Sequence, residues 1–365
     1  MIRPATLALC LALASAPVGA GDLGTMRTFQ DWTAGCDNGR ACTALSLLAE
    51  DGASSWFLRL DRKADAAAPV QLTLIPQSPT YPRTGTLRLR AASVDIATLK
   101  YGEGLRTEND GLVIEDRKAV AAVLAVMRSA RKLEIISERQ PAGTEVLANI
   151  SLVGAKAALL WIDERQQRID TVTALVGRGR KPASAVPAPP ALPAAVAERT
   201  TDGGPPPEAL AEATRSEMIR QSADYCDEDR GGPDPDSNNM ARLGRDLLLA
   251  SVRCLSGAYN SGRAYFLLEE GAVARVRPAL FPRPVEQKVE EDRESTPDNV
   301  LWNADFAPNS TEISHFAKGS GMADCGETGV WRWDGHAFQA LSMTEMNSCS
   351  GIMAGYWPNT YSSRK

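Results

Sequence analysis

Seven cysteines constrain the fold of this chain more than any other feature of its sequence. Cys10 lies near the N-terminus, and six more follow: Cys36, Cys42, Cys226, Cys254, Cys325 and Cys349. An even number of cysteines in an exported chain is typical of a disulfide framework, whereas cysteines in a reducing compartment more often bind metals or carry out redox chemistry. How the six are interpreted therefore depends on the compartment.

The N-terminus predicts export. Arg3 is followed by a largely apolar run over residues 5–14 and then by the small residues Val18 and Ala20. This pattern is typical of a secretory signal peptide, here residues 1–20. Cleavage of that peptide would also remove Cys10. The apolar run is too short for a permanent transmembrane helix, and no later apolar run is longer. We therefore expect a periplasmic protein, or one secreted beyond the periplasm, that does not span the membrane.

The six remaining cysteines can pair in fifteen ways. Cys36 and Cys42 precede a proline-rich stretch and the other four follow it, so these two pair if no bridge crosses that stretch. Three arrangements then remain for the later four. Of these we expect the sequential one, with bridges Cys226–Cys254 and Cys325–Cys349.

The same proline-rich stretch divides the chain. Residues 177–207 hold many prolines interleaved with alanine, a composition that forms a semi-extended spacer and does not pack a core. We therefore expect an N-terminal domain over residues 21–176 and a C-terminal domain over residues 208–365, each of ordinary domain size.

The N-terminal half predicts an α+β domain with strands in the majority. Residues 56–61 and 86–91 alternate apolar and polar side chains, as half-buried strands do. Asp116 can cap a helix whose apolar stripe is formed by Val120, Val123, Leu124 and Met127. A second helix is expected within residues 151–168, with one apolar face formed by Val153, Ala157, Leu160 and Trp161.

The C-terminal half predicts a mainly antiparallel β domain after a short helix at residues 207–221. Asp334 and Gly335 stand between two strand-like runs, which indicates a hairpin with a type I′ turn. The whole chain is thus expected to be α+β and strand-dominated.

One aromatic cluster could form a binding surface. It comprises Trp331, Trp333, Asp334 and His336, with other rings nearby in the sequence. If alternate rings are exposed on a sheet face, they could stack on a sugar or grip a protein partner. Packing in the core of a small disulfide-linked domain explains the same rings.

No motif predicts catalysis, a cofactor or a metal. There are two histidines, His315 and His336, and no C-x-x-C motif, so the residues for a zinc site are lacking. A calcium loop that begins in the acidic stretch at residues 227–239 would require Gly and Glu at the positions where Asn239 and Arg245 stand. The net charge of −5 argues against binding to nucleic acid.

The two ends of the chain carry motifs that resemble one family. The first runs Phe29-x-Asp31-Trp32-x-x-x-Cys36-Asp37-Asn38, with Cys42-x-Ala44 after it, and the others are Phe316-x-Lys318-Gly319, Ala323-Asp324-Cys325-Gly326 and Trp331-x-Trp333-Asp334-Gly335-x-x-Phe338. They closely resemble the exported proteobacterial proteins of domain-of-unknown-function family 1176. The resemblance covers nearly the whole mature chain and implies a signal peptide and six cysteines.

The N-terminal half also resembles the invasion-associated locus B family. The likeness lies in the early F-x-D-W…C motif, a helix at residues 118–129 and the closing run Ile150-Ser151-Leu152-x-Gly154-x-x-Ala157-Ala158-Leu159. That family is linked to host-cell invasion without a settled biochemical activity. Neither resemblance implies catalytic residues.

These observations predict an exported, non-catalytic binding or interaction protein of the cell envelope, stabilised by three disulfides. Its partner would be an envelope protein or a glycan. The alternative is a hydrolase acting on an envelope polymer, which would need a cleft with two carboxylates. A redox protein would need an exposed thiol of low pKa, and the wide cysteine spacings disfavour it.

Overall fold

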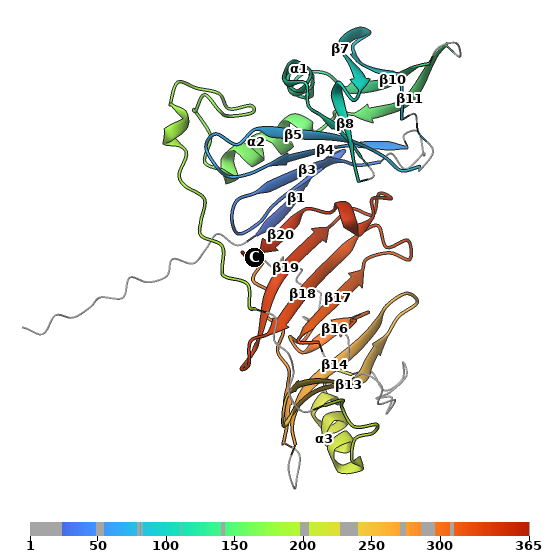
Figure 1. The fold of residues 1–365 in the computed structure, drawn as a ribbon, viewed down its shortest axis with the longest axis vertical. Helices are drawn as coiled ribbons and strands as arrows, with labels where there is room; N and C mark the ends of the chain where they lie inside the picture. Colours follow the sequence, from blue (N-terminus) through green and yellow to red (C-terminus); the bar gives the residue numbers. More distant parts are fainter. Residues whose placement is uncertain are drawn as a thin grey trace, which may run out of the picture.

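A computed structural model describes residues 24–48, 55–78, 81, 83–109, 111–139, 143–197, 204–226, 240–270, 275–285, 296–306 and 310–364. The predicted signal peptide at residues 1–20 and the acidic loop at residues 227–239 lie outside the described residues. Three β-sheets follow one another along the long axis of the molecule (Figure 1). No helix in the described ranges is long and apolar enough to cross a membrane.

The N-terminal half forms an eleven-stranded sheet in the order β1-β2-β3-β4-β5-β9-β8-β7-β6-β10-β11. Its strands are β1 Thr25–Phe29, β2 Trp32–Cys36, β3 Cys42–Ser46, β4 Trp56–Arg62, β5 Val70–Pro76, β6 Thr86–Ala91, β7 Val94–Tyr101, β8 Gly104–Glu108, β9 Gly111–Ile114, β10 Lys132–Arg139 and β11 Gly143–Ser151. Within this sheet only β7 and β8 pair in parallel. The sheet curls so that β11, at one edge, contacts β4.

Helix α1 (Arg117–Met127) begins where the sequence predicts. The Asp116 carboxylate accepts hydrogen bonds from the backbone N–H groups of Lys118 and Ala119, at 2.7 and 3.0 Å. Such a cap satisfies N–H groups that have no partner within the helix. The helix packs its apolar stripe on β5, β7 and β9, with Val123 and Met127 buried.

Helix α2 (Ala155–Arg165) is confirmed in place, but of the residues predicted for its apolar face only Trp161 is buried. The buried side chains are those of Ala155, Ala158, Leu159, Trp161, Ile162 and Asp163, whereas Leu160 is 42% exposed. The helix begins only after Gly154, so Val153 does not belong to it. Several apolar residues fit a helical period, and the contact with β1, β2 and β3 selects which of them are buried.

The C-terminal half contains two antiparallel sheets, as the sequence predicts. One has strands β12 Met240–Gly244, β13 Leu247–Ser256, β14 Ser261–Glu269, β15 Arg275–Pro278 and β16 Val300–Trp302. The other has strands β17 Glu312–Lys318, β18 Gly326–Trp333, β19 Phe338–Met346 and β20 Asn359–Ser362. The two sheets share a core that includes Tyr265, Phe281 and Trp331. Helix α3 (Glu212–Ser222) packs through Met218 against the far face of the sheet formed by β12–β16 (Figure 1).

The hairpin between β18 and β19 is confirmed, but its predicted turn is wrong. Trp333 pairs with Phe338, so the connection has four residues and is not a two-residue turn. Gly335 has a φ of 107°, whereas Asp334 does not have the positive φ that a type I′ turn needs. The Asp334 carboxylate instead accepts hydrogen bonds from the N–H groups of His336 and Ala337.

The two halves contact each other through a shared hydrophobic core. Leu45, Phe57 and Ile75 of the first sheet pack with residues of the C-terminal half, namely Cys325, Met346, Ile352 and Trp357. The glycine at position 35 brings β2 so close to Pro358 that an added Cβ would lie 2.6 Å from the proline ring. These contacts hold the first sheet against the C-terminal half. Whether the halves are separate domains stays a prediction.

The proline-rich segment runs along one side of the molecule and bonds to both halves (Figure 1). Arg40 donates a hydrogen bond to the carbonyl of Ala188 at 2.6 Å, and Arg332 donates one to the carbonyl of Val196 at 2.6 Å. Ala195 and Arg364 are also linked, by a backbone hydrogen bond of 2.7 Å. The described part of this segment contains a short 3₁₀ helix at Ala183–Ala185 and is anchored to both halves.

Candidate functional site

Three disulfides staple the fold, and they are the bridges of the sequential pairing: Cys36–Cys42, Cys226–Cys254 and Cys325–Cys349. The first joins residues that face each other on β2 and β3. The second ties the end of α3 to β13, and the third joins the loops that flank the β18–β19 hairpin. Because each sulfur is bonded to another, none of the six cysteines offers a thiolate as a metal ligand in this state.

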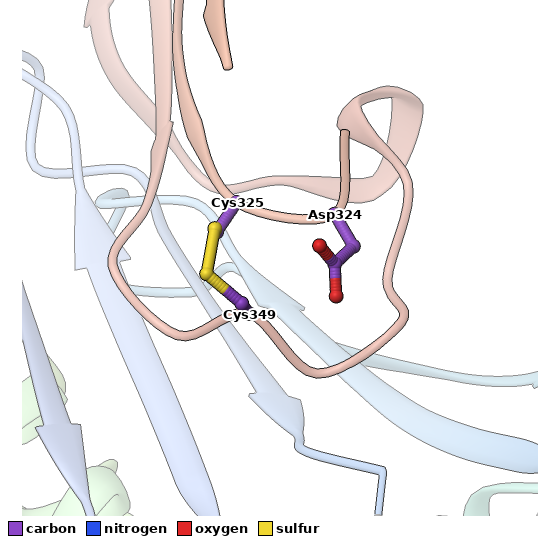
Figure 2. A group of neighbouring side chains, drawn as sticks. All are labelled: Asp324, Cys325 and Cys349. Atoms are coloured by element: carbon purple, nitrogen blue, oxygen red, sulfur yellow. A yellow bond between two sulfur atoms is a disulfide. The ribbon is translucent and has the colours of Figure 1, made fainter. Parts of the chain in front are cut away.

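Asp324 lies beside the third disulfide (Figure 2). Burial raises the pKa of this carboxyl, but hydrogen bonds from the Ser320 hydroxyl and the Gly351 N–H outweigh burial and hold the pKa below its usual value. The carboxylate thus fixes two loops to each other. The two sulfur atoms nearest to it are bonded to each other in the Cys325–Cys349 disulfide. The cluster of Asp324, Cys325 and Cys349 therefore lacks the thiolate ligands that a metal ion would need.

The proposed aromatic binding surface is not exposed. Trp331 and Trp333 are 1% and 2% exposed and fill the core between the two C-terminal sheets. The Trp331 ring N–H donates to the carbonyl of Pro282 at 2.8 Å. Asp334 and His336 belong to the turn of the hairpin, so the structure separates the four residues into core and turn. Core packing, the other interpretation of these rings, agrees with their burial.

His315 is buried, and its imidazole ring links Trp302 to Glu327. Its Nδ1 accepts a hydrogen bond from the Trp302 N–H at 3.1 Å, and its Nε2 lies 3.1 Å from a carboxylate oxygen of Glu327. Burial lowers the pKa of His315, and Glu327 opposes that effect only in part. The space beside the ring is about 10 Å³, room for about one water molecule. Both ring nitrogens are occupied, so neither is free to act on a substrate.

A buried charged cluster joins α2, β4 and the segment after α2, and the sequence contained no pattern that predicts it. Asp163 is fully buried and accepts hydrogen bonds from the N–H groups of Leu175 and Val176, both at 2.7 Å. Arg62 lies 3.4 Å from the same carboxylate. Burial and the neighbouring charge of Arg168 lower the pKa of Arg62 to about 10, so it is still charged at neutral pH. The cluster folds the chain after α2 back onto the sheet.

A groove of about 290 Å³ lies between the two halves. Its floor comes from β4, β5 and β9, one end comes from the β8–β9 turn, and its wall is the short 3₁₀ helix η3 (Ala354–Tyr356) of the C-terminal half. We call it the junction groove, and it is lined by Arg59, Asp61, Gln71, Thr73, Ile75, Glu108, Asn109, Gly111, Val113, Gly355 and Tyr356.

Strand alternation explains the polar floor of the junction groove. Side chains two residues apart on a strand share a face, and register places Arg59 opposite Thr73 and Asp61 opposite Gln71. Phe57 lies on the same face. Its ring packs against the ring of Tyr356 from the other half, with 5.3 Å between the ring centroids. The C-terminal half therefore covers the apolar part of this face and leaves the polar part open.

The charged pair on the floor is held in a fixed geometry. Arg59 bonds both oxygens of Asp61, at 2.6 and 2.8 Å, and its third bond goes to the carbonyl of Tyr356 at 2.9 Å. The Thr43 hydroxyl donates to Asp61 at 2.6 Å. In contrast, no described residue hydrogen-bonds to the side chain of Gln71, Thr73 or Asn109. Bidentate Arg–carboxylate pairs are rigid, so the floor combines a fixed pair with polar groups that have no partner.

Comparison with known proteins agrees with the sequence motifs. Residues 26–364 match the model of a family described as "Protein of unknown function (DUF1176)". The chain belongs to the DUF1176 family. A relative of this DUF1176 protein is "Uncharacterized protein YpfG" of Escherichia coli (strain K12), which is 28% identical over 354 residues and 93% of each chain.

A solved structure resembles part of this DUF1176 protein. It is the invasion associated protein B from Bartonella henselae, with 18% identity and a TM-score of 0.30. The match covers 39% of this chain and 99% of that chain.

The motif residues near the N-terminus of this DUF1176 protein are structural. The Trp32 ring N–H donates to the carbonyl of Ser151 at 2.9 Å, and Asp37 accepts hydrogen bonds from the N–H groups of Gly39 and Ala41. Burial raises the pKa of Asp37 despite these bonds. The motif thus secures the turn that carries the first disulfide, and the junction groove lies outside it.

Proposed function

We propose that this DUF1176 protein is an exported, periplasmic binding protein of the cell envelope, which takes its ligand in the junction groove and catalyses no reaction. The proposal rests on one observation: Gln71, Thr73 and Asn109, whose side chains hydrogen-bond to no described residue, line a groove whose floor is a hydrogen-bonded sheet. Binding on a preorganised surface loses little conformational entropy. The three disulfides suit an oxidising compartment.

The carboxylates of the groove favour binding over hydrolysis. Asp61 and Glu108 both line it, as the hydrolase alternative requires of two acidic residues. However, both oxygens of Asp61 are bonded to Arg59, and Glu108 pairs with Arg106 at 2.9 Å. Each carboxylate is thus engaged by a guanidinium and would have to leave that contact to act as a nucleophile.

Site-specific photocrosslinking in the periplasm tests the proposal. A photoreactive amino acid in place of Gln71 is expected to capture an envelope component, while the same residue in place of Val94, which is 61% exposed on β7, is expected to capture none. Equal capture at both positions, or none at Gln71, would overturn the binding function of this groove. Release of fragments from an envelope polymer by the purified protein, abolished by Glu108→Gln, would establish the hydrolase instead.

A further inference from the structure

We infer that the ligand of the junction groove is an uncharged saccharide unit, held by the Arg59–Asp61 pair and the side chains of Gln71, Thr73 and Asn109. This inference rests on the proposed binding function and names the chemical class of the ligand.

Hydrogen-bonding capacity supports a polyhydroxylated ligand. A sugar hydroxyl both donates and accepts, so it needs neighbours of both kinds. The amides of Gln71 and Asn109 offer two donors and an acceptor each, and the Thr73 hydroxyl offers both. Arg59 uses three of its N–H groups in the structure, which leaves about two of the five that a guanidinium carries. The floor therefore offers both donors and acceptors.

The charge of the floor argues for an uncharged ligand. Arg59 and Asp61 neutralise each other at 2.6 Å. Glu108 and the Tyr356 phenol also line the groove, and Glu108 pairs at 2.9 Å with Arg106, a guanidinium that it shares with Glu115. A phosphate or sulfate ligand would call for an excess of guanidinium groups, and a cationic ligand would call for carboxylates without a partner. Neither is present in the described lining.

The size and the apolar parts of the groove fit a sugar ring. Its volume of about 290 Å³ lies near the lower limit of about 300 Å³ for small-molecule sites, which suits a mono- or disaccharide unit. Tyr356 adds apolar ring surface beside the polar floor, with small contributions from Ile75 and Val113, which are 2% and 6% exposed. Sugar rings present C–H groups on one face and hydroxyls at their edges, so they need this combination of surfaces.

Gly355 offers a way to block the groove without disturbing the fold. It lines the wall, and an added Cβ there would meet no atom within 4 Å. Gly355→Trp should therefore fill the groove, and Gly355→Ala is its matched control. For the polar floor, Gln71→Ala has a matched control in Gln339→Ala, because Gln339 is an exposed glutamine on β19 outside the lining.

The test is calorimetric titration of the exported protein with N,N′-diacetylchitobiose and maltose as uncharged probes, and with chitobiose and a sulfated disaccharide as charged ones. We expect an uncharged probe to bind, Gly355→Trp to abolish binding, and Gln71→Ala to weaken it up to about tenfold through a lost hydrogen bond. Both control variants should bind like the parent protein.

The other outcomes separate the two proposals. Binding of the charged probes alone would overturn the uncharged saccharide and leave the binding function standing. Failure of all four probes, together with capture of an envelope component at Gln71, would do the same. Failure of all probes and of crosslinking would overturn both. Binding that Gly355→Trp does not reduce would place the saccharide outside the groove and overturn the inference.

Discussion

At the scale of single residues, most buried polar groups of this protein are already satisfied. Asp163 accepts from backbone N–H groups, Asp324 from Ser320 and Gly351, and His315 uses both ring nitrogens. A buried polar group without a partner is costly, so such contacts stabilise the fold and leave little capacity for a ligand. The side chains of Gln71 and its neighbours in the groove differ because they keep that capacity.

His315 should make stability depend on pH. Burial lowers its pKa, so the folded protein resists a proton that the unfolded chain takes up below about pH 6.5, the ordinary value for histidine. The free energy of unfolding should therefore fall as the pH decreases from 7.5 to 5.5. His315→Gln should cost about 1–3 kcal/mol at pH 7.5, because Trp302 and Glu327 lose a partner, and should flatten the pH dependence. Urea unfolding at both pH values measures this.

The exposed residue His336 provides the control for that experiment. His336→Gln should show the same loss of stability as the parent protein between pH 7.5 and 5.5. An equally steep pH dependence in His315→Gln would show that another group is responsible.

At the scale of secondary-structure elements, the first sheet uses its two faces for different purposes. Leu58 and Leu72 face the main core of the N-terminal half, whereas Phe57 faces the C-terminal half and Arg59 faces the groove. The elements are held together by close backbone contacts. At Gly154, where β11 turns into α2, φ is 93° and an added Cβ would lie 1.8 Å from the carbonyl oxygen of Phe29.

Gly154→Ala should therefore destabilise the protein by more than about 2 kcal/mol, because it combines strain at positive φ with a backbone clash. Thermal unfolding of the purified variant measures the effect. Gly355→Ala, which meets no neighbour, should change stability by less than about 0.5 kcal/mol. Equal stability of the two variants would mean that the β11–α2 turn relaxes freely.

At the scale of the whole molecule, the shared core and the anchored proline-rich segment join the halves. Phe57 is fully buried in that core and packs against Tyr356 of the other half. Two halves that share a hydrophobic core are expected to unfold cooperatively, because unfolding of either half exposes the core of both. The wall and the floor of the junction groove also come from different halves, so the groove depends on this contact.

The exported protein should therefore unfold in one calorimetric transition. Phe57→Ala should lower its stability by about 3–5 kcal/mol, as truncation of a buried aromatic does, and should separate the transition into two. Val94→Ala, at a residue that is 61% exposed, should leave a single transition unchanged. Two transitions in the parent protein would show that the halves are independent domains.

Features that depend on neighbours in the sequence were predictable from it. Asp116 caps α1 two and three residues ahead, and the buried Leu87 and Leu89 alternate with half-buried arginines because a strand turns successive side chains to opposite faces. Cys36 pairs with Cys42 across a short connection. A local pattern carries the information for each of these features.

The buried face of α2, the burial of Trp333 and the junction groove were decided only by the tertiary structure. Arg59, Gln71, Glu108 and Tyr356 meet in the groove although they lie far apart in the chain. Phe57 lies on the same face of β4 as Arg59, yet the C-terminal half covers Phe57 and leaves Arg59 open to the groove. Local patterns determine which residues share a face of one strand. Strand order and the packing of the two halves determine what that face meets, because those contacts join residues whose separation in the sequence no short-range period encodes.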